Sequence, residues 1–111
     1  MMFEVKAVVR LDKQDDVIRA LHEIPDLPGV TLSVVEGIGR RQSMEGEAPQ
    51  PFGRVSMAKI EIVVGADRLA RVMAAIELSA RTGRPGDGKV FVFKVEQVMK
   101  IRTGETGIAA L

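Results

Sequence analysis

Apolar residues recur at every second position in four segments of this chain and at every third or fourth position in two others, and the order of these segments is the strongest constraint on the fold. The first spacing is typical of a strand with one buried face, and the second is typical of a helix that packs one side against a core. In chain order, the predicted elements are strand 3–9, helix 15–24, strand 29–38, strand 55–64, helix 68–81 and strand 90–95.

Residues near the ends of the two predicted helices support these boundaries. Asp15 and Asp16 favour the positive N-terminal end of the first helix, and Pro25 and Pro28 close it. Gly83 is placed to cap the C-terminal end of the second helix. The apolar residues that the second helix is expected to turn toward the core are Leu69, Val72, Met73, Ile76 and Ala80.

The order β-α-β-β-α-β predicts an α+β fold, a ferredoxin-like sandwich in which both helices cover one face of an antiparallel sheet. The other face of that sheet is also partly apolar, so it needs a cover, and association of identical chains is the natural one. A chain of 111 residues is long enough for one domain and too short for two. We therefore expect residues 1–111 to form a single domain whose larger binding sites include a neighbouring subunit.

Composition excludes several classes of function. The chain has 16 Lys and Arg residues against 15 Asp and Glu residues, so it carries no strong field that would attract nucleic acid. It contains no Cys, which excludes disulfides, thiolate metal sites and Cys nucleophiles, and His22 is its single histidine, which excludes a His-cluster metal site. No N-terminal apolar run resembles a signal peptide or membrane span, so we expect a cytoplasmic protein that does not insert into a membrane.

The two glycine-containing polar segments are the candidates for function. Periodicity disappears from Arg40 to Gly53, where glycines and prolines interrupt a polar run, so a long mobile loop is predicted between two neighbouring strands. Residues 82–89, called the glycine loop here, hold three glycines with Arg84 and Lys89. Such a loop can bring backbone amides and cations to a phosphate, but its spacing matches neither the Walker nor the Rossmann pattern. The residues alone leave a plain loop before a strand equally open.

The stretch 81–92 (RTGRPGDGKVFV) resembles the C-terminal signature of the PII signal-transduction family, which includes nitrogen regulators. The resemblance extends to 100–105, 59–64, 34–40 and 15–17, so it covers the chain apart from the long loop. On these segments the chain is identified as a member of the PII family, in a divergent PII-like branch.

The resemblance implies a homotrimer that binds an adenine nucleotide, ATP or ADP with AMP as a further candidate, in each cleft between subunits. It makes 40–54 the T-loop, which contacts a membrane transporter or a cytoplasmic enzyme, 82–89 the B-loop, and 100–111 the C-terminal loop and tail. Lys100 and Arg102 would reach the phosphates from the adjacent subunit. The residues placed at the nucleotide are Thr31, Gly39, Arg40, Glu61, Val63, Thr82, Gly86, Asp87, Gly88, Lys89, Lys100 and Arg102. Those placed at the partner are Arg41, Gln42, Ser43, Met44, Glu45, Phe52 and Arg54.

Three positions depart from the family pattern. Lys100 stands where the family usually has Arg, which keeps the charge and loses the two-pronged grip on phosphate. Arg41 replaces the Gln that would coordinate magnesium beside 2-oxoglutarate, and Met57 replaces the Lys that would pair with this ligand. We therefore doubt that 2-oxoglutarate is sensed, and a role for magnesium stays open. The chain contains no Tyr, so tyrosine uridylylation is impossible, and phosphorylation at Ser43 is given no weight.

Several functions stay open on the sequence. The first is a regulator in which ATP and ADP compete for the cleft and bias the T-loop toward or away from a partner. A PII-like regulator linked to heavy-metal efflux or carbon uptake is an alternative within the family. A third is a small phosphate-ester enzyme with Asp87 or Glu61 as acid or base and Lys89 stabilising charge, although no nucleophile supports it. The last is an interaction module whose nucleotide site is vestigial.

Overall fold

The computed structural model describes residues 1–39 and 53–111. Its strands are β1 (Met2–Arg10), β2 (Thr31–Gly39), β3 (Gly53–Gly65) and β4 (Gly88–Val95), and its helices are α1 (Gln14–His22) and α2 (Ala66–Ala80). Short 3-10 turns, η1 (Leu11–Lys13) and η2 (Ile108–Ala110), precede α1 and end the chain. The strands form one antiparallel sheet in the order β2-β3-β1-β4.

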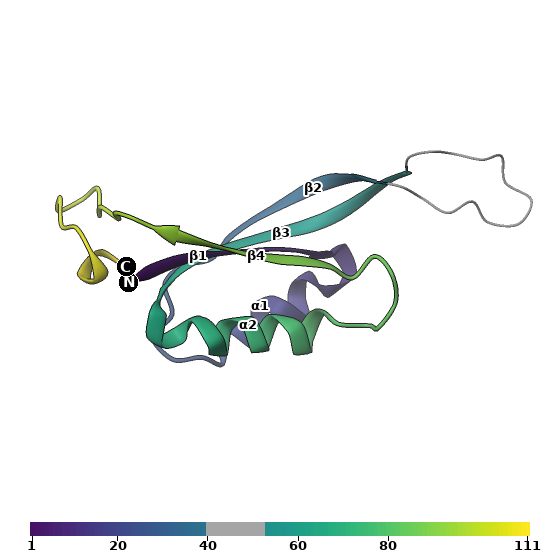
Figure 1. Cartoon of the computed structure of the whole chain (residues 1–111), viewed down its shortest axis with the longest axis horizontal. Coiled ribbons are helices and arrows are strands. Elements are labelled where there is room, and N and C mark those ends of the chain that lie inside the picture. Colours follow the sequence, from purple (N-terminus) through teal and green to yellow (C-terminus); the bar gives the residue numbers. More distant parts are fainter. Residues whose placement is uncertain (40–52) are drawn as a thin grey trace, which may run out of the picture.

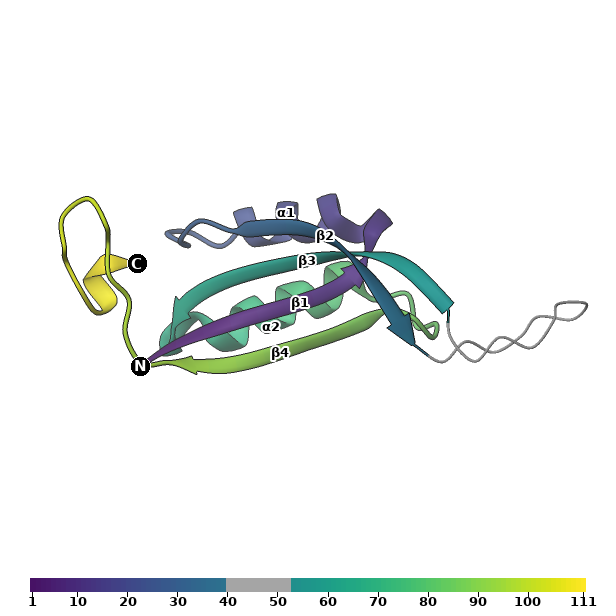
Figure 2. The ribbon, with the colours of Figure 1, turned by 90° about the horizontal axis from the view of Figure 1, so that it is seen from above.

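Both helices lie against the same face of the sheet, and the other face is open (Figure 1). Figure 2 looks onto this open face, with α2 behind the central strands. The predicted ferredoxin-like α+β sandwich is therefore confirmed, with β1 and β3 in the middle of the sheet and β2 and β4 at its edges.

Strand pairing moves two of the predicted boundaries, the starts of the third and fourth strands. Gly53 and Arg54 were expected in the long loop, but they pair with Gly39 and Ile38 and form the start of β3. Gly88 and Lys89 were expected in the glycine loop, but they belong to β4, where they pair with β1. The sequence pattern missed these ends because glycines and cations give no apolar alternation, although their backbone groups still pair.

The predicted cap of the second helix at Gly83 is wrong. α2 ends at Ala80, and Arg81 is already extended, with φ −72° and ψ 129°. The amide of Arg81 donates to the carbonyl of Glu77. Gly83 does have a positive φ of 83°, but its amide donates to Asp87 inside the glycine loop instead of closing the helix.

The core lies between the two helices and the central strands. β1 contributes Val5, Ala7 and Val9, and β3 contributes every second residue from Ala58 to Val64. The buried helix residues are Val17 and Leu21 on α1 and Val72, Ile76 and Ala80 on α2. Met73 was expected in this core, but it is 38% exposed, because it lines the open groove between α2 and the edge strand β4.

The open face combines charged and apolar side chains. Residues paired across antiparallel strands share a face, so Lys6 of β1 stands in one row with Glu61 of β3 and Phe91 of β4. The Nζ atom of Lys6 lies 5.0 Å from the ring centroid of Phe93 and 5.9 Å from that of Phe91. Both rings remain exposed, so a single chain leaves aromatic surface on this face uncovered.

The segment after β4 turns back on itself at the end of the sheet opposite the glycine loop (Figure 1). Met99 forms a bridge with Thr106, and the amide of Lys100 donates to the carbonyl of Glu105 at 2.8 Å. Ala110 in η2 is buried, which fixes the chain end against the body of the domain. None of the helices in the described residues is both long enough and apolar enough to cross a membrane.

Replacement of Ile76 by Ala should lower the free energy of unfolding by about 2–5 kcal/mol, because it removes a fully buried side chain and leaves a cavity. The matched control is Leu78→Ala on the same helix, since Leu78 is 81% exposed and its replacement should change stability by less than about 0.5 kcal/mol. Urea denaturation at one fixed protein concentration measures both. Equal losses in the two variants would contradict this placement of the core.

Candidate functional site

The glycine loop joins α2 to β4 at the end of the sheet where β1 finishes. The β2–β3 pair extends from the same end toward residues 40–52 (Figure 1). The loop therefore stands beside the base of the long loop, although the two are distant in sequence.

The carboxylate of Asp87 organises the glycine loop from inside. Its Oδ2 accepts hydrogen bonds from the amides of Thr82 and Gly83, both at 2.9 Å. Its Oδ1 accepts from the Nε of Arg10 at 2.8 Å and from the hydroxyl of Thr82. Arg10, followed by these Thr82 and Gly83 donors, holds the pKa of the Asp87 carboxyl well below its ordinary value of 3.8. The side chain of Asp87 thus points into its own loop, so a contribution to phosphate binding would come from its backbone.

Sequence reasoning missed Arg10. Its guanidinium also donates from Nη2 to the carbonyl oxygen of Pro85 at 2.7 Å, so it holds two points of the glycine loop. Arg10 and Asp87 are 77 positions apart in the chain, and only the pairing of β1 with β4 brings them together. The one available signal was a cation at the end of the first strand, which by itself is typical of a solvated residue.

The backbone of the loop depends on glycine at two positions. Gly86 and Gly88 have φ values of 95° and 96°, a region that other residues rarely adopt. A Cβ atom at Gly88 would also lie 1.8 Å from the carbonyl oxygen of Val8, so the loop approaches β1 too closely for any side chain. Within the described residues, no acceptor is found for the amide of Gly86, which leaves it available to an anion.

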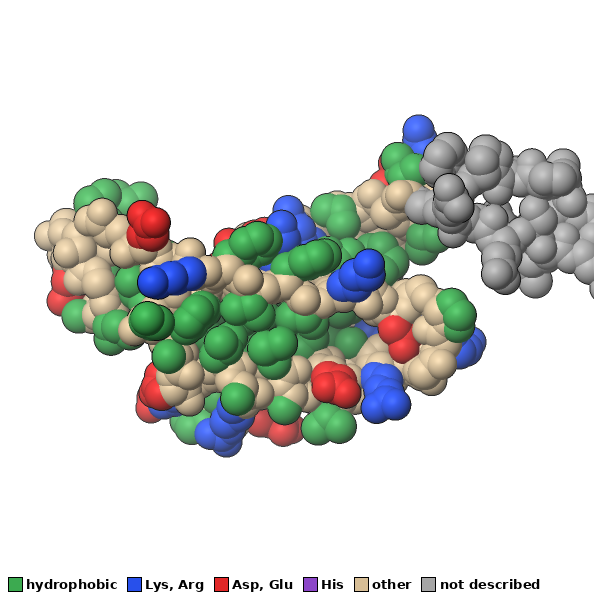
Figure 3. Space-filling view, viewed as in Figure 1, with side chains coloured by type: hydrophobic (Ala, Val, Ile, Leu, Met, Phe, Trp, Pro, Cys, Tyr) green, Lys and Arg blue, Asp and Glu red, His purple; other side chains and the backbone are tan. Residues whose placement is uncertain are grey.

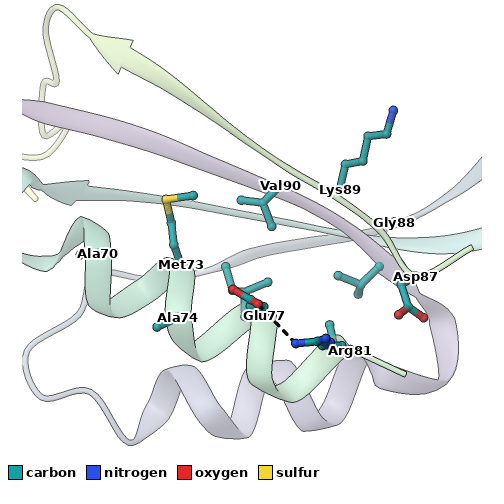
Figure 4. A pocket seen from close by; sticks show the side chains of 12 residues that line it. Ala70, Met73, Ala74, Glu77, Arg81, Asp87, Gly88, Lys89 and Val90 are labelled. Atoms are coloured by element: carbon teal, nitrogen blue, oxygen red, sulfur yellow. Dashed lines mark ion pairs between the residues drawn. The ribbon is translucent and has the colours of Figure 1, made fainter. Parts of the chain in front are cut away.

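A groove of about 480 Å³ runs between α2 and the edge strand β4, next to the glycine loop. Its walls are mainly apolar, with Met73 and Ala74 on the helix and Val90 on the strand, and Figure 3 shows this apolar band between sheet and helix. Glu77 and Arg81 form an ion pair of 3.7 Å at its rim (Figure 4). The side chain of Lys89 points away from the groove, so the cation of the loop faces a different side.

Thr31, Glu61 and Val63, the residues expected at the base, lie on β2 and β3, away from the edge strand β4. Thr31 opens β2 and pairs with Glu61 of β3, whereas the glycine loop leads into β4. Because β2 and β4 are opposite edges of the sheet, one chain keeps Thr31 apart from the loop.

The carboxyl groups of Glu61 and Glu4 interact on the open face. A hydrogen bond between the two carboxyl groups raises the pKa of Glu4 and lowers that of Glu61. Lys59, whose Nζ is 3.5 Å from a Glu61 oxygen, lowers the pKa of Glu61 further. Glu61 is therefore the more acidic member of this pair.

The C-terminal cations also lie away from the glycine loop of their own chain. Lys100 pairs with Glu105 at 4.0 Å, and Arg102 is exposed at the tip of the turn. This segment and the glycine loop occupy opposite ends of the sheet (Figures 1 and 2). A site that contains both must therefore take them from different subunits.

The expected residues near the long loop are only partly described. Gly39 ends β2, and Arg54, expected in the partner-binding loop, is a strand residue whose guanidinium lies 3.7 Å from Glu36. Among residues 1–39 and 53–111, no cluster of three or more His, Asp or Glu side chains could hold a metal ion. The expected residues that fall outside the described part of the chain are Arg40, Arg41, Gln42, Ser43, Met44, Glu45 and Phe52.

The fold and the loop define an antiparallel α+β sandwich with a glycine-rich, cation-bearing turn at one sheet edge. The family model described as "Nitrogen regulatory protein P-II" matches residues 2–105. Nitrogen regulatory protein P-II of Bradyrhizobium diazoefficiens is 38% identical over 99% of this chain and 100% of its own length. Nitrogen regulatory protein P-II 1 of Escherichia coli K12 shows the same identity and coverage. This chain belongs to the P-II family, whose members are named as regulatory proteins and not as enzymes.

Solved structures agree with this assignment. The GlnK-ATP complex of B. subtilis is 32% identical, covers 99% of this chain and 95% of its own, and superposes with a TM-score of 0.84. The PII protein of Arabidopsis thaliana bound to citrate is 39% identical, covers 99% and 92%, and has a TM-score of 0.82. The described chain therefore has the fold of two PII proteins that were solved with small anionic ligands.

The carboxyl carbon of Asp87 should not titrate when the pH of the folded protein is lowered from about 7 to about 3, because its pKa lies below the ordinary aspartate value. Stabilisation by this carboxylate is present above the unfolded pKa and is lost only as the pH falls through the lower folded value. Carboxyl-carbon NMR measures this directly. The urea-unfolded chain is the control, and an Asp87 signal that titrates alike in both states would contradict the hydrogen-bonded geometry.

Proposed function

We propose that this protein is a PII-type regulator that binds ATP or ADP in the clefts between the subunits of a homotrimer and acts on a partner through residues 40–54. The observation that carries the proposal is the separation of the glycine loop from Lys100 and Arg102 at opposite ends of one chain. The glycine loop offers a free amide with Arg84 and Lys89, and the opposite end offers Lys100 and Arg102. A polyphosphate would need both, and a neighbouring subunit can supply the second.

The phosphate end of the site consists of the glycine loop and Lys89. The amide of Gly86 is free of acceptors in the described chain, and Lys89 supplies a positive charge in the same loop. Lys100 and Arg102 add charge from the adjacent subunit, and Arg40 is assigned here on family resemblance alone. The similarity to the B. subtilis GlnK-ATP complex supports ATP as the ligand.

The base end consists of Thr31, Glu61 and Val63 from the subunit that presents its β2 edge. Glu61 is ionised because Glu4 and Lys59 lower its pKa, so its carboxylate can accept hydrogen bonds from the amino group of adenine or from a ribose hydroxyl. Gly39 lies at the far end of β2, beside the start of the T-loop.

Trimer formation also explains the surfaces that one chain leaves uncovered. The edges β2 and β4 are both free, and both carry exposed apolar residues, such as Val34 on one and Val92 on the other. Two different edges can join head to tail, and a rotation of one third of a turn at each contact closes three chains into a ring. The rings of Phe91 and Phe93 on the open face would be covered inside such a ring.

The partner side of the proposal rests on the T-loop. β2 and β3 pair as far as Gly39 and Gly53, so the T-loop leaves the domain on a paired two-stranded stem. Arg54 and Glu36 form an ion pair at the end of this stem. A change in loop conformation between ATP and ADP states would be read by a transporter or an enzyme, and a system for heavy-metal efflux or carbon uptake is an alternative to nitrogen metabolism.

Mixed trimers should test whether each nucleotide site takes residues from two subunits. Lys89→Met and Arg102→Met should each weaken ATP binding by about tenfold or more, since each removes one charged phosphate contact. Co-expression of the two variants should produce trimers in which one cleft has both cations, with wild-type affinity. Calorimetry on such trimers, isolated with two affinity tags, measures this. If both cations served the same cleft from one subunit, no mixed trimer would recover tight binding.

2-Oxoglutarate should not bind with ATP and magnesium, because Met57 offers no charge to a carboxylate and its side chain is only 9% exposed. Calorimetric titration of 2-oxoglutarate into the ATP-loaded protein with magnesium should give no heat of binding. Met57→Lys places a cation at that position and serves as the comparison. Tight magnesium-dependent binding to the unmodified protein would contradict the expectation.

A further inference from the structure

We propose that Arg10 positions the glycine loop for phosphate binding, and that it does so from β1 without contacting the nucleotide itself. This inference rests on the proposed function, because it takes the glycine loop as the phosphate site. It adds a positioning residue to that site from a part of the chain that carries no glycine or phosphate-binding pattern.

Two hydrogen bonds from one planar group fix the shape of the loop. The Nε of Arg10 donates to Asp87 at 2.8 Å, and its Nη2 donates to the carbonyl of Pro85 at 2.7 Å. Gly86 lies between these two contacts, and a Cβ atom there would be 3.4 Å from the same Nη2. The guanidinium therefore packs directly against the turn that contains the free Gly86 amide.

The same contact removes an unfavourable charge from the site. A free Asp87 carboxylate in this loop would repel a phosphate group, and its pKa shows that it stays ionised. Arg10 neutralises it, and the Thr82 and Gly83 donors hold the carboxylate on the inner side of the loop. With Asp87 paired, the charges that the loop presents outward are those of Arg84 and Lys89.

The ion pair between Arg10 and Asp87 is partly shielded from solvent. The side chains of Arg10 and Asp87 are 25% and 24% exposed, so solvent screens the pair only in part. Arg10 follows Val9, which is buried in the core, and pairs with Met57, so the guanidinium extends from the end of a central strand. A rigid strand thus sets the position of an otherwise irregular loop.

Three variants separate positioning from direct contact. Arg10→Met removes the charge and both donors, Arg10→Lys keeps the charge but cannot reach two acceptors in the same fixed geometry, and Asp87→Asn removes the charged acceptor. The matched control is Arg19→Met, which makes the same change of charge on α1, where the 72% exposed Arg19 side chain forms an ion pair with Asp16 at 3.5 Å.

Calorimetry should be performed with ATP and, separately, with inorganic tripolyphosphate. Arg10→Met should weaken the binding of both by about tenfold, Arg10→Lys should weaken it less, and Arg19→Met should leave it unchanged. Asp87→Asn should also weaken the binding of both ligands. The double variant should bind them no more weakly than Arg10→Met does, because both changes break the same contact between Arg10 and Asp87. In the nucleotide-free protein, hydrogen exchange at the amides of Thr82 and Gly83 should be faster in Arg10→Met than in Arg19→Met.

The outcomes distinguish the inference from the function on which it rests. If Asp87→Asn tightens ATP binding, Arg10 has been released to contact phosphate directly, and the positioning role is wrong. If Arg10→Met binds ATP as the wild type does, the contact is merely structural. A folded wild-type protein that binds no adenine nucleotide at all would remove the proposed function first, and the inference with it. Should Arg10→Met fail to fold, Arg10→Lys and Asp87→Asn carry the same comparison.

Discussion

A four-stranded sheet with two helices can cover only one of its faces, and this limit governs the remaining structure. The helices of this chain bury Val5, Ile60 and Ile62, and they leave Phe91 and Phe93 on the open side. The edge strands β2 and β4 are also free. Residues that contact one ligand can therefore lie on different edges or at different ends of the sheet, because association of neighbouring copies would bring them together. The proposed nucleotide site follows this arrangement.

The glycine loop shows how electrostatics and backbone geometry act together at the site. Positive φ values at Gly86 and Gly88 turn the backbone, and the close approach to Val8 allows no side chain at Gly88. The Asp87 carboxylate, which would oppose an anion if free, is instead paired with Arg10 and bonded to loop amides. A negatively charged residue thus organises the loop that we propose to bind phosphate.

Much of the fold could be predicted from local pattern, because burial of one face forces a regular apolar spacing. The alternation of Ile60, Ile62 and Val64 and the helical spacing of Val72 and Ile76 both correspond to buried residues. Where backbone pairing or competing hydrogen bonds decide, the pattern was insufficient. Strand ends at glycines and cations were misplaced, and the cap expected at Gly83 is wrong because Asp87 accepts its amide hydrogen bond.

The sequence by itself determined the order of elements, the family, and the segments that carry glycines and cations, since these are properties of neighbouring residues. Only the tertiary structure decided that Arg10 belongs to the glycine loop, that Asp87 faces inward, and that Lys100 lies at the far end of its own chain. Such facts depend on contacts between residues far apart in the chain. Strand pairing creates those contacts, and no local spacing of residues encodes them.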